Sequence, residues 1–387
     1  MAFIPYSRPE IGEAEIAEVI DTLKSGWLTT GPKTKQFEDD FAEFVQAKFA
    51  LGVNSATAGL HLALEALGVT KADYVITTVH TFTASAEIIR YLGATPLFAD
   101  IEADSYCICP KSVEKLLAQY DNVKVVIPVH YAGQICDMDA LLALQHIYDF
   151  KLLEDAAHAL PATYNGKMVG TISDVTVFSF YANKTITTGE GGMVTTNDET
   201  IANRIKIMRL HGIDKDAFYR FQSDKPSWHY EVVAPGYKYN LTDIASSIGI
   251  HQLKKAHQFR KKRQKIAEIY NQAFADLPVI CPKPRNSNDL HAWHIYCLQI
   301  DTDKLNISRA EFIERLSQKG VGCSVHYIPL HQHPYWQQEF NLTDEDFPIS
   351  TRISSRHLSL PNFPGMTDDE ITHVANMVCE VALEAIK

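Results

Sequence analysis

A series of short apolar runs in the first half of the chain constrains its fold most strongly. The runs are FALGV, YVITTV, TPLFADI, VKVVIPVH, KLLED, DVTVFSF and GMVTTND. Several are apolar at successive positions instead of alternating, which is typical of strands buried on both faces. Helix-like stretches such as LHLALEALGV separate many of them. The pattern predicts an α/β domain with a mostly parallel sheet.

The pattern changes beyond about residue 245. A long helical stretch, DIASSIGIHQLKKAHQFRKKRQKIAEIYNQAF, is followed by HAWHIYCLQI, which we interpret as a strand, and by two capping boxes that begin at Ser308 and Thr367. We therefore expect a large α/β domain over residues 1–245 and a smaller α+β domain over residues 246–387. The basic run RKKRQK inside the long helix is interpreted as a solvated helix face, with a nucleotide-phosphate contact as the alternative.

An amphipathic helix is expected near the N-terminus. Ile16, Val19, Ile20 and Leu23 follow the spacing of one helical face, and Gly26 is a stop signal.

Composition and charge exclude several classes of function. The net charge of −11 argues against non-specific binding to nucleic acid or anionic membranes. The opening MAFIPYSRPE resembles no signal peptide, and the sequence contains no apolar run of about 18 residues that would suggest membrane insertion. The cysteines are scattered, and no zinc spacing completes the pair Cys107 and Cys109, so no metal site is expected. We expect a cytoplasmic protein.

Lys184 follows the apolar run DVTVFSF, in a loop that contains Gly189, Gly191 and Gly192. Ligands of parallel sheets bind at the carboxyl ends of strands, so this is where chemistry is expected. A lysine beside apolar walls is costly unless it is paired, has a shifted pKa or is used covalently. A lysine that forms a Schiff base with an aldehyde cofactor meets these conditions.

Three more strand ends carry candidate residues. In LLEDAAHAL, Glu154 or Asp155 either caps a following helix or pairs with a buried cation, and His158 would face the same side of that helix. In NSATAG, Ser55 or Thr57 either simply caps a helix or marks a phosphate-binding helix start. Phe82 in TFTAS is either a core residue or a flat surface on which a planar ring stacks.

Together these residues meet the needs of pyridoxal phosphate. That cofactor requires a lysine for its aldehyde, a carboxylate for its ring nitrogen, a phosphate cradle and a stacking face. Asp155 and Lys184 lie at the ends of two predicted strands and can therefore flank one ring. A nucleotide-binding fold fits less well, because neither GxGxxG after a strand nor GxxxxGK[ST] occurs.

Over nearly its whole length the sequence resembles the DegT-type sugar aminotransferases, which are pyridoxal-phosphate enzymes of fold type I. The matching stretches include SGWLTTGPKTKQFE, NSATAGLHLAL, TFTAS, IPVHYAG, EDAAHAL, FSFYANKTITTGEGG, GYKYNLTDI and GCSVHYIPLH. Several look most like the branch that makes UDP-4-amino-4-deoxy-L-arabinose. The resemblance implies a mostly parallel, seven-stranded sheet sandwiched by helices, plus a smaller C-terminal domain.

The resemblance also implies roles for individual residues. Lys184 would bind the cofactor covalently and move protons, Asp155 would pair with the ring nitrogen, and His158 would support that pairing or contact the ring hydroxyl. Further residues would bind the cofactor: the phosphate is assigned to Ala56, Thr57 and Ser179, with Phe82 stacking on the ring. Many relatives have Asn and Arg where this chain has Lys238 and Asn240, so the resemblance leaves open which of the two reaches the phosphate.

The implied reaction moves an amino group from L-glutamate, giving 2-oxoglutarate, to a keto group of a nucleotide-linked sugar. Among the candidate substrates, a UDP-linked 4-keto sugar is favoured. The product would be used to build cell-surface polysaccharide or lipopolysaccharide. Trp27, Thr30 and His326 are candidates for the sugar pocket, with packing roles as the alternative. The resemblance also implies a homodimer with shared active sites.

Two other classes of protein are considered, a sugar dehydratase and a non-catalytic regulator. A histidine replaces the lysine in the dehydratases, so Lys184 argues against that class.

Overall fold

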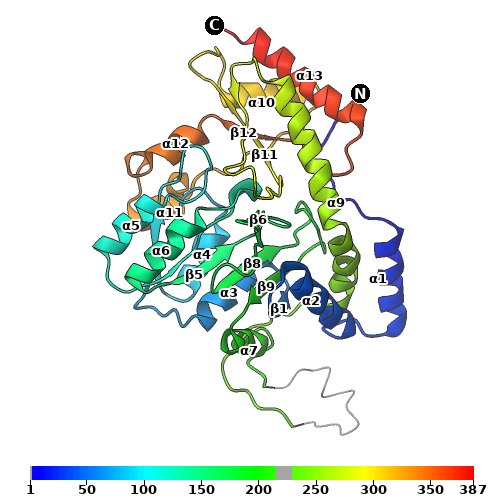
Figure 1. Ribbon diagram of the computed structural model, residues 1–387, viewed down its shortest axis with the longest axis vertical. Coiled ribbons are helices and arrows are strands. Elements are labelled where there is room, and N and C mark those ends of the chain that lie inside the picture. Colours follow the sequence, from blue (N-terminus) through cyan, green and yellow to red (C-terminus); the bar gives the residue numbers. More distant parts are fainter. Residues whose placement is uncertain (1, 215–228) are drawn as a thin grey trace.

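The computed structural model describes residues 2–214 and 229–387. Its centre is a seven-stranded sheet in the order β1-β9-β8-β5-β4-β2-β3 (Figure 1). The pairs from β8 to β3 are parallel, while β9 runs antiparallel to both β8 and β1. The predicted, mostly parallel sheet is thus confirmed. Its strands are β1 Phe49–Val53, β2 Tyr74–Thr78, β3 Thr95–Ala99, β4 Val123–Val126, β5 Lys151–Asp155, β8 Val175–Ser179 and β9 Gly192–Thr196.

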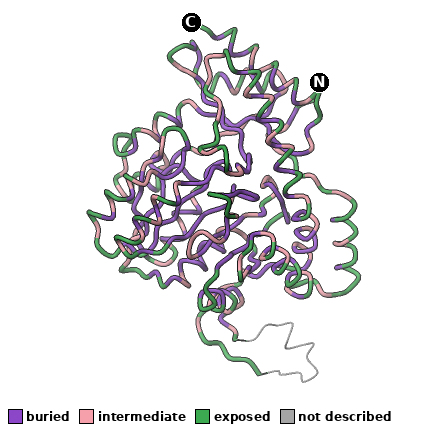
Figure 2. The backbone as a smooth tube through the Cα atoms, viewed as in Figure 1, coloured by how far each residue is buried: buried purple, intermediate pink, exposed green. Residues whose placement is uncertain are grey.

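Helices cover both faces of this sheet, which explains why its strands are apolar at successive positions. One face packs against α3 (Ala56–Ala66), α4 (Ala84–Tyr91) and α7 (Glu199–Met208). The other packs against α2 (Pro32–Val45), α5 (Pro110–Gln119), α6 (Met138–Tyr148) and the first half of α9 (Asp243–Ala273). In Figure 2 the sheet is accordingly the most continuously buried part of the backbone. A hairpin of β6 (Thr163–Tyr164) and β7 (Lys167–Met168) follows β5.

A second core lies at the end of the molecule that carries both termini (Figure 1). It is built on a small sheet of β10 (Val279–Ile280), β11 (Tyr296–Ile300) and β12 (His357–Leu360), with α10 (Arg309–Gln318) and α13 (Asp368–Glu384). The capping boxes predicted at Ser308 and Thr367 begin these two helices. Two short helices, α11 (Pro334–Phe340) and α12 (Pro348–Ser354), precede β12.

Helix α9 connects the two cores. Leu253 and Phe259 pack in the core of the large sheet, whereas Ile266 and Tyr270 pack in the second core. The expected boundary near residue 245 therefore falls in the first turn of a helix that belongs to both cores, and it stays a prediction. None of the helices within the described residues is long and apolar enough to cross a membrane.

Helix α1 (Glu13–Ser25) confirms the predicted N-terminal helix, but it presents its apolar stripe outward. Ile16 and Ile20 are each 45% exposed, and Leu23 is 53% exposed. The opposite, charged face packs on α9, where Glu15 is fully buried and pairs with Lys255 at 2.6 Å. This orientation reverses the usual arrangement of an amphipathic surface helix.

Three sequence-based interpretations are wrong in detail. RKKRQK is not simply a solvated face, because the helical period turns Arg260 and Arg263 into the interior. Arg263 there donates to backbone carbonyls of His294 and Asn362.

Residues 156–162 after β5 form turns instead of a helix, since Pro161 has no backbone N–H to donate. Residues 291–295 of HAWHIYCLQI form a loop that precedes β11.

Candidate active site

A cavity of about 490 Å³ opens at the edge of the sheet where β1, β2, β5 and β8 end. These strands run in the same direction, so the residues that follow them meet at one edge. Most of the residues expected to bind cofactor or substrate line this cavity: Ala56, Thr57, Phe82, Asp155, His158, Ser179, Lys184 and His326. The roles assigned to these residues stay predictions, but their convergence at one hollow is a structural fact.

Lys184 lies in the turn that follows β8, where its backbone N–H donates to the carbonyl of Tyr181 at 3.0 Å. Burial lowers the pKa of its ammonium group to about 8, and the nearby negative charge of Asp155 partly opposes this shift. An amine with such a pKa is neutral in an appreciable minority of the molecules near physiological pH, far more than at its ordinary pKa of 10.5. It is therefore suited to act as a nucleophile and as a proton carrier.

Asp155 is the last residue of β5, and its carboxylate is held from two sides. The hydroxyl of Ser85 on α4 donates to Oδ2 at 2.7 Å, and the backbone N–H of Ala157 donates to Oδ1 at 3.1 Å. Because Ser85 donates to the carboxylate, Thr81 must donate to the Ser85 hydroxyl at 2.8 Å. The three side chains form a directed chain that fixes the carboxylate in the cavity wall.

The preceding residue, Glu154, points to the opposite face of β5 and has a structural role. It is fully buried and accepts hydrogen bonds from His130 at 2.7 Å, Ser173 at 2.6 Å and Thr176 at 2.9 Å. Burial raises the pKa of Glu154, but these hydrogen bonds outweigh that effect and the pKa lies below its ordinary value. Of the two carboxylates that the sequence offered, the structure therefore directs only Asp155 to the cavity.

His158 is held in one tautomer. Its Nδ1 accepts the backbone N–H of Ala132 at 3.2 Å, so in the neutral ring the proton resides on Nε2, 3.0 Å from the hydroxyl of Tyr327. Burial, with the charge of Lys184 as the second cause, holds the pKa of His158 well below its usual value. His158 is thus a neutral donor that supports its neighbour Tyr327.

The start of α3 forms one end of the cavity. Ser55 is its N-cap, as the sequence allowed, and accepts the N–H of Ala58 at 3.1 Å. The first backbone hydrogen bond of the helix runs from Gly59 to Ser55, so the amide groups of Ala56 and Thr57 precede the helical ladder. Such amides, together with the positive helix end, suit a phosphate group.

Two further predicted residues form the outer wall. Phe82 is 57% exposed, which is unusual for a core aromatic, and its ring lies 5.8 Å from that of Tyr327. His326 is held by Ser359, at 2.9 Å from Nδ1, and burial lowers its pKa to about 3. Phe82 therefore presents a free flat face, whereas His326 is a neutral group tied to β12.

Four of the predicted residues lie outside this cavity. The hydroxyl of Thr30 donates to the carbonyl of Leu241 and accepts from the side-chain amide of Asn240 at 2.7 Å, while Lys238 Nζ donates to Asn240. Trp27 donates through Nε1 to the carbonyl of Thr30 at 3.0 Å. The structure thus gathers Trp27, Thr30, Lys238 and Asn240 into one cluster, but not around the chain's own cavity.

Sequence reasoning missed several residues of the site. Ser85 and Tyr327 were not assigned, although both lie in quoted stretches, TFTAS and GCSVHYIPLH. Asn183, next to Lys184, lines the cavity and has a buried Oδ1 without a hydrogen-bond partner among the described residues. The one-turn spacing from Thr81 to Ser85 could have indicated the contact between those two residues, but no pattern pointed to the contact with Asp155 or to Asn183.

The residues present fit pyridoxal phosphate. Lys184 and Asp155 share one hollow, free amide groups begin α3, Phe82 offers a stacking face, and Asn183 carries an unpartnered acceptor. Unsatisfied polar groups of this kind are costly in a structural cavity and typical of a ligand site. The fold and this site define a pyridoxal-phosphate-type transferase.

The chain belongs to the DegT/DnrJ/EryC1/StrS aminotransferase family, which it matches over residues 9–379. It is 50% identical to the uncharacterized protein MJ1066 of Methanocaldococcus jannaschii, over 99% of this chain and 98% of that protein. It is 46% identical to the spore coat polysaccharide biosynthesis protein SpsC of Bacillus subtilis, over 98% and 97% of the two chains.

Solved structures agree with this assignment. Spr1654 from Streptococcus pneumoniae in its PLP form, described as a sugar aminotransferase, has a TM-score of 0.90 at 32% identity, with 100% of both chains covered. PseC of Helicobacter pylori, an aminotransferase of pseudoaminic acid biosynthesis, has a TM-score of 0.90 at 30% identity, covering 99% and 100%. The resemblance seen in the sequence is confirmed at the level of the family, and Spr1654 carries the cofactor that the sequence predicts.

Proposed function

We propose that this protein transfers the amino group of L-glutamate to a keto carbon, at C4, of a nucleotide-linked sugar. The observation that carries the proposal is the placement of Lys184, with its lowered pKa, and Asp155 in one cavity beside the start of α3. Pyridoxal phosphate bound there would act as an electron sink for the carbon that loses or gains its proton.

Lys184 has two tasks in this proposal. In its neutral form it would bind the cofactor aldehyde, and once an amino substrate had displaced it, the same amine would carry the proton between substrate and cofactor. Both tasks need an amine that is neutral in part of the molecules near physiological pH, which the pKa of about 8 provides.

Asp155 and His158 orient the reaction. The carboxylate, fixed by Ser85 and Ala157, would keep the ring nitrogen of the cofactor protonated. His158, held neutral, adds no positive charge that would compete for that carboxylate. Phe82, which lines the cavity and is largely exposed, would cover one face of the ring and exclude water from it.

The substrate class rests on the relatives. SpsC is named for spore coat polysaccharide biosynthesis and PseC for pseudoaminic acid biosynthesis, and Spr1654 is described as a sugar aminotransferase. A UDP carrier and the C4 position come from the sequence resemblance. We place the enzyme in the cytoplasm, with its product destined for a surface polysaccharide or lipopolysaccharide.

We further propose that two copies of the chain assemble and complete each other's sites. Of the described residues that line the cavity, Lys184 is the only lysine or arginine, although a cofactor phosphate and a diphosphate sugar both carry negative charge. The cluster of Trp27, Thr30, Lys238 and Asn240 would supply the missing groups to the partner's cavity. The exposed apolar stripe of α1 supports a covered interface.

The assembly is tested by a charge in the α1 stripe. Ile20→Lys should give a monomer in sedimentation equilibrium and weaken binding of pyridoxal phosphate, because a buried unpaired charge is costly at an interface. Ile147→Lys is the matched control, since Ile147 is 70% exposed on α6 and away from the stripe. A dimer that persists with Ile20→Lys would contradict this surface assignment.

The reaction is tested with purified protein, pyridoxal phosphate, L-glutamate and a panel of keto sugars linked to UDP, dTDP or GDP. We expect 2-oxoglutarate and an amino sugar to form in equal amounts from a UDP-linked 4-keto sugar. Loss of a sugar hydroxyl without 2-oxoglutarate would indicate the dehydratase instead, and failure to bind the cofactor would favour the non-catalytic regulator. Lys184 argues against the dehydratase, and a non-catalytic regulator would be expected to lose parts of this set of residues.

A further inference from the structure

Three residues of the cavity have no role in the account so far: Tyr181, Asn183 and Glu190. Two of them share the turn that carries Lys184, because the backbone N–H of Lys184 donates to the carbonyl of Tyr181 at 3.0 Å and Asn183 lies between these residues. A substrate whose reacting carbon is close to Lys184 therefore has its neighbouring atoms beside this turn.

Glu190 lies across from the turn on the neighbouring segment. β8 and β9 pair antiparallel, and the hydrogen bond from the N–H of Phe180 to the carbonyl of Gly191, at 2.9 Å, extends their ladder beyond the strand ends. Tyr181 and Glu190 are the next residues of the two segments. Tyr181 also follows Ser179 by two residues, so the two side chains project from the same face, and both line the cavity. Tyr181, Asn183 and Glu190 thus form one wall, which we call the turn wall.

Two hydrogen-bond acceptors of the turn wall have no partner in the part of the chain that the structure describes. They are the buried Oδ1 of Asn183 and the exposed carboxylate of Glu190. Free acceptors are satisfied by a ligand that brings donors. The hydroxyl groups of a sugar can donate, whereas the carboxylates of L-glutamate and the phosphates of a nucleotide only accept. The turn wall therefore suits a sugar ring better than the amino donor.

Tyr181 adds a flat surface to these acceptors. Its side chain is 48% exposed, although its ring is large and mostly apolar. Phe82 lies in the outer wall and is the residue expected to stack on the planar cofactor ring, so the ring of Tyr181 is left for a second ligand. An aromatic side chain with an apolar face and a polar tip suits a sugar ring, which has C–H groups on its faces and hydroxyl groups at its edge.

We propose that the turn wall is the subsite for the sugar ring of the keto substrate. Glu190 and Asn183 accept hydrogen bonds from its hydroxyl groups, and Tyr181 packs against its face. This inference rests on the proposed function and adds residues that distinguish the sugar from the amino donor. Because the carboxylate of Glu190 repels anions, the diphosphate of the substrate extends away from it.

The test is calorimetric binding to the holoenzyme in its pyridoxal form, which has no amino group to give and therefore binds a keto sugar without turnover. Glu190→Gln should raise the Kd of a UDP-linked 4-keto sugar about tenfold, because a neutral amide replaces the charged acceptor of a hydroxyl group. The Kd of UDP, which lacks the sugar, should stay the same or fall, since a negative charge has been removed. Glu199→Gln, at an exposed glutamate on α7 outside the cavity, should change neither value.

A second variant tests the other acceptor. Asn183→Ala should also raise the Kd of the UDP-linked 4-keto sugar more than that of UDP. An unchanged Kd of the keto sugar in Glu190→Gln, or an equal rise for UDP, would overturn the inference and leave the proposed function intact. Weaker assembly of two copies in sedimentation equilibrium of Glu190→Gln would also overturn it, because the carboxylate would then belong to the interface. Wild-type protein that aminates no sugar of the panel would overturn the proposed function and this inference with it.

Discussion

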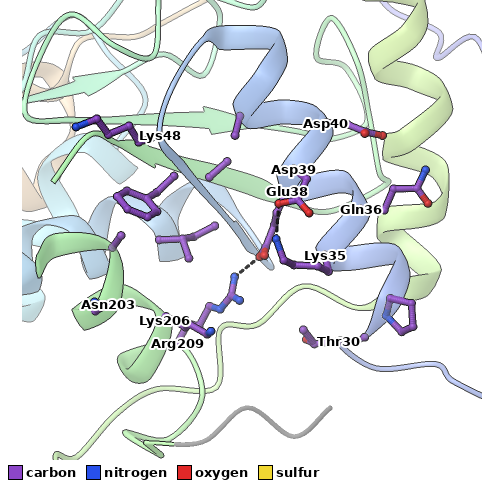
Figure 3. Close-up of a pocket in the computed structure, with 17 residues that line it drawn as sticks. Thr30, Lys35, Gln36, Glu38, Asp39, Asp40, Lys48, Asn203, Lys206 and Arg209 are labelled. Atoms are coloured by element: carbon purple, nitrogen blue, oxygen red, sulfur yellow. Dashed lines mark hydrogen bonds and ion pairs between the residues drawn. The ribbon is translucent and has the colours of Figure 1, made fainter. Parts of the chain in front are cut away.

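Two hollows in this protein differ in whether their charged and polar groups have partners within the protein. The cofactor cavity measures about 490 Å³, whereas a larger groove of about 820 Å³ lies between α2, β1 and α7 (Figure 3). In the groove, Arg209 pairs with Glu38 at 2.5 Å, as the dashed line in Figure 3 shows, and the same pair satisfies the backbone N–H and C=O of Gly52 on β1.

The cavity leaves comparable groups unsatisfied. Among the described residues, Lys184 has a lowered pKa instead of a close ion pair, Asn183 has an unpartnered oxygen, and the amides that begin α3 have no helical acceptor. The comparison teaches that size does not identify an active site. The better guide is the combination in one hollow of a lysine with a lowered pKa, an unpartnered acceptor and the amides that begin a helix, because a ligand can use all three.

The largest expected effect is on catalysis at the cavity. Lys184→Ala should lower the rate of amino transfer by at least about 10³-fold, because it removes both the cofactor link and the proton carrier. Lys206→Ala, a lysine that lines the groove, should leave the rate unchanged. The midpoint of thermal unfolding of Lys184→Ala without cofactor should not fall, since the variant removes a partly buried cation whose pKa is lowered. Equal rates in both variants would contradict the distinction between the two hollows.

The groove should behave in the opposite way. Arg209→Ala leaves Glu38 buried and unpaired, so the free energy of unfolding should fall by about 3–5 kcal/mol, measured by urea denaturation. Activity per folded molecule should be retained. Arg204→Ala is the control: Arg204 is 38% exposed and pairs with Glu65, so its loss should cost about 1 kcal/mol or less. A rate defect in folded Arg209→Ala would give the groove a functional role.

A smaller effect is expected for Ser85→Ala, which removes one of the two hydrogen bonds to Asp155. A hydrogen bond to a charged group contributes about 1.5–3 kcal/mol, so the rate of amino transfer should fall by about tenfold or more. Thr83→Ala provides the comparison, because the hydroxyl of Thr83 bonds to Glu87 on the same helix and does not reach Asp155. Equal rates for the two variants would argue against the positioning chain.

The smallest effect is a dependence on pH. Since the neutral amine attacks the aldehyde, capture of pyridoxal phosphate by the cofactor-free protein should accelerate as pH rises towards about 8 and then level off. The lowered pKa also means that the unfolded chain binds more protons than the folded one, so this group lets stability rise with pH from about 8 to the ordinary value of 10.5. Stopped-flow absorption measures the capture rate, and a midpoint near the ordinary value would contradict the burial of Lys184.

Much of the fold and part of the candidate site could be predicted from the sequence. The strands are buried on both faces and therefore leave a strong local pattern of apolar residues. The position of Lys184 at the end of β8 and of Asp155 at the end of β5 followed from that pattern alone. The chain from Thr81 through Ser85 to Asp155 did not, since it joins segments 70 residues apart. The outward stripe of α1 was also beyond prediction, because the spacing of Ile16 and Ile20 defines a face but not which neighbour covers it.

The measurement that tests the central claim most directly is the visible absorption of the protein with pyridoxal phosphate, before and after L-glutamate is added. We predict a yellow band that bleaches as 2-oxoglutarate forms in equal amount, and Lys184→Ala should show no such exchange. A bound cofactor whose band persists with L-glutamate would contradict the proposed amino donor. Absence of any band in the wild-type protein would contradict the assignment of Lys184 itself.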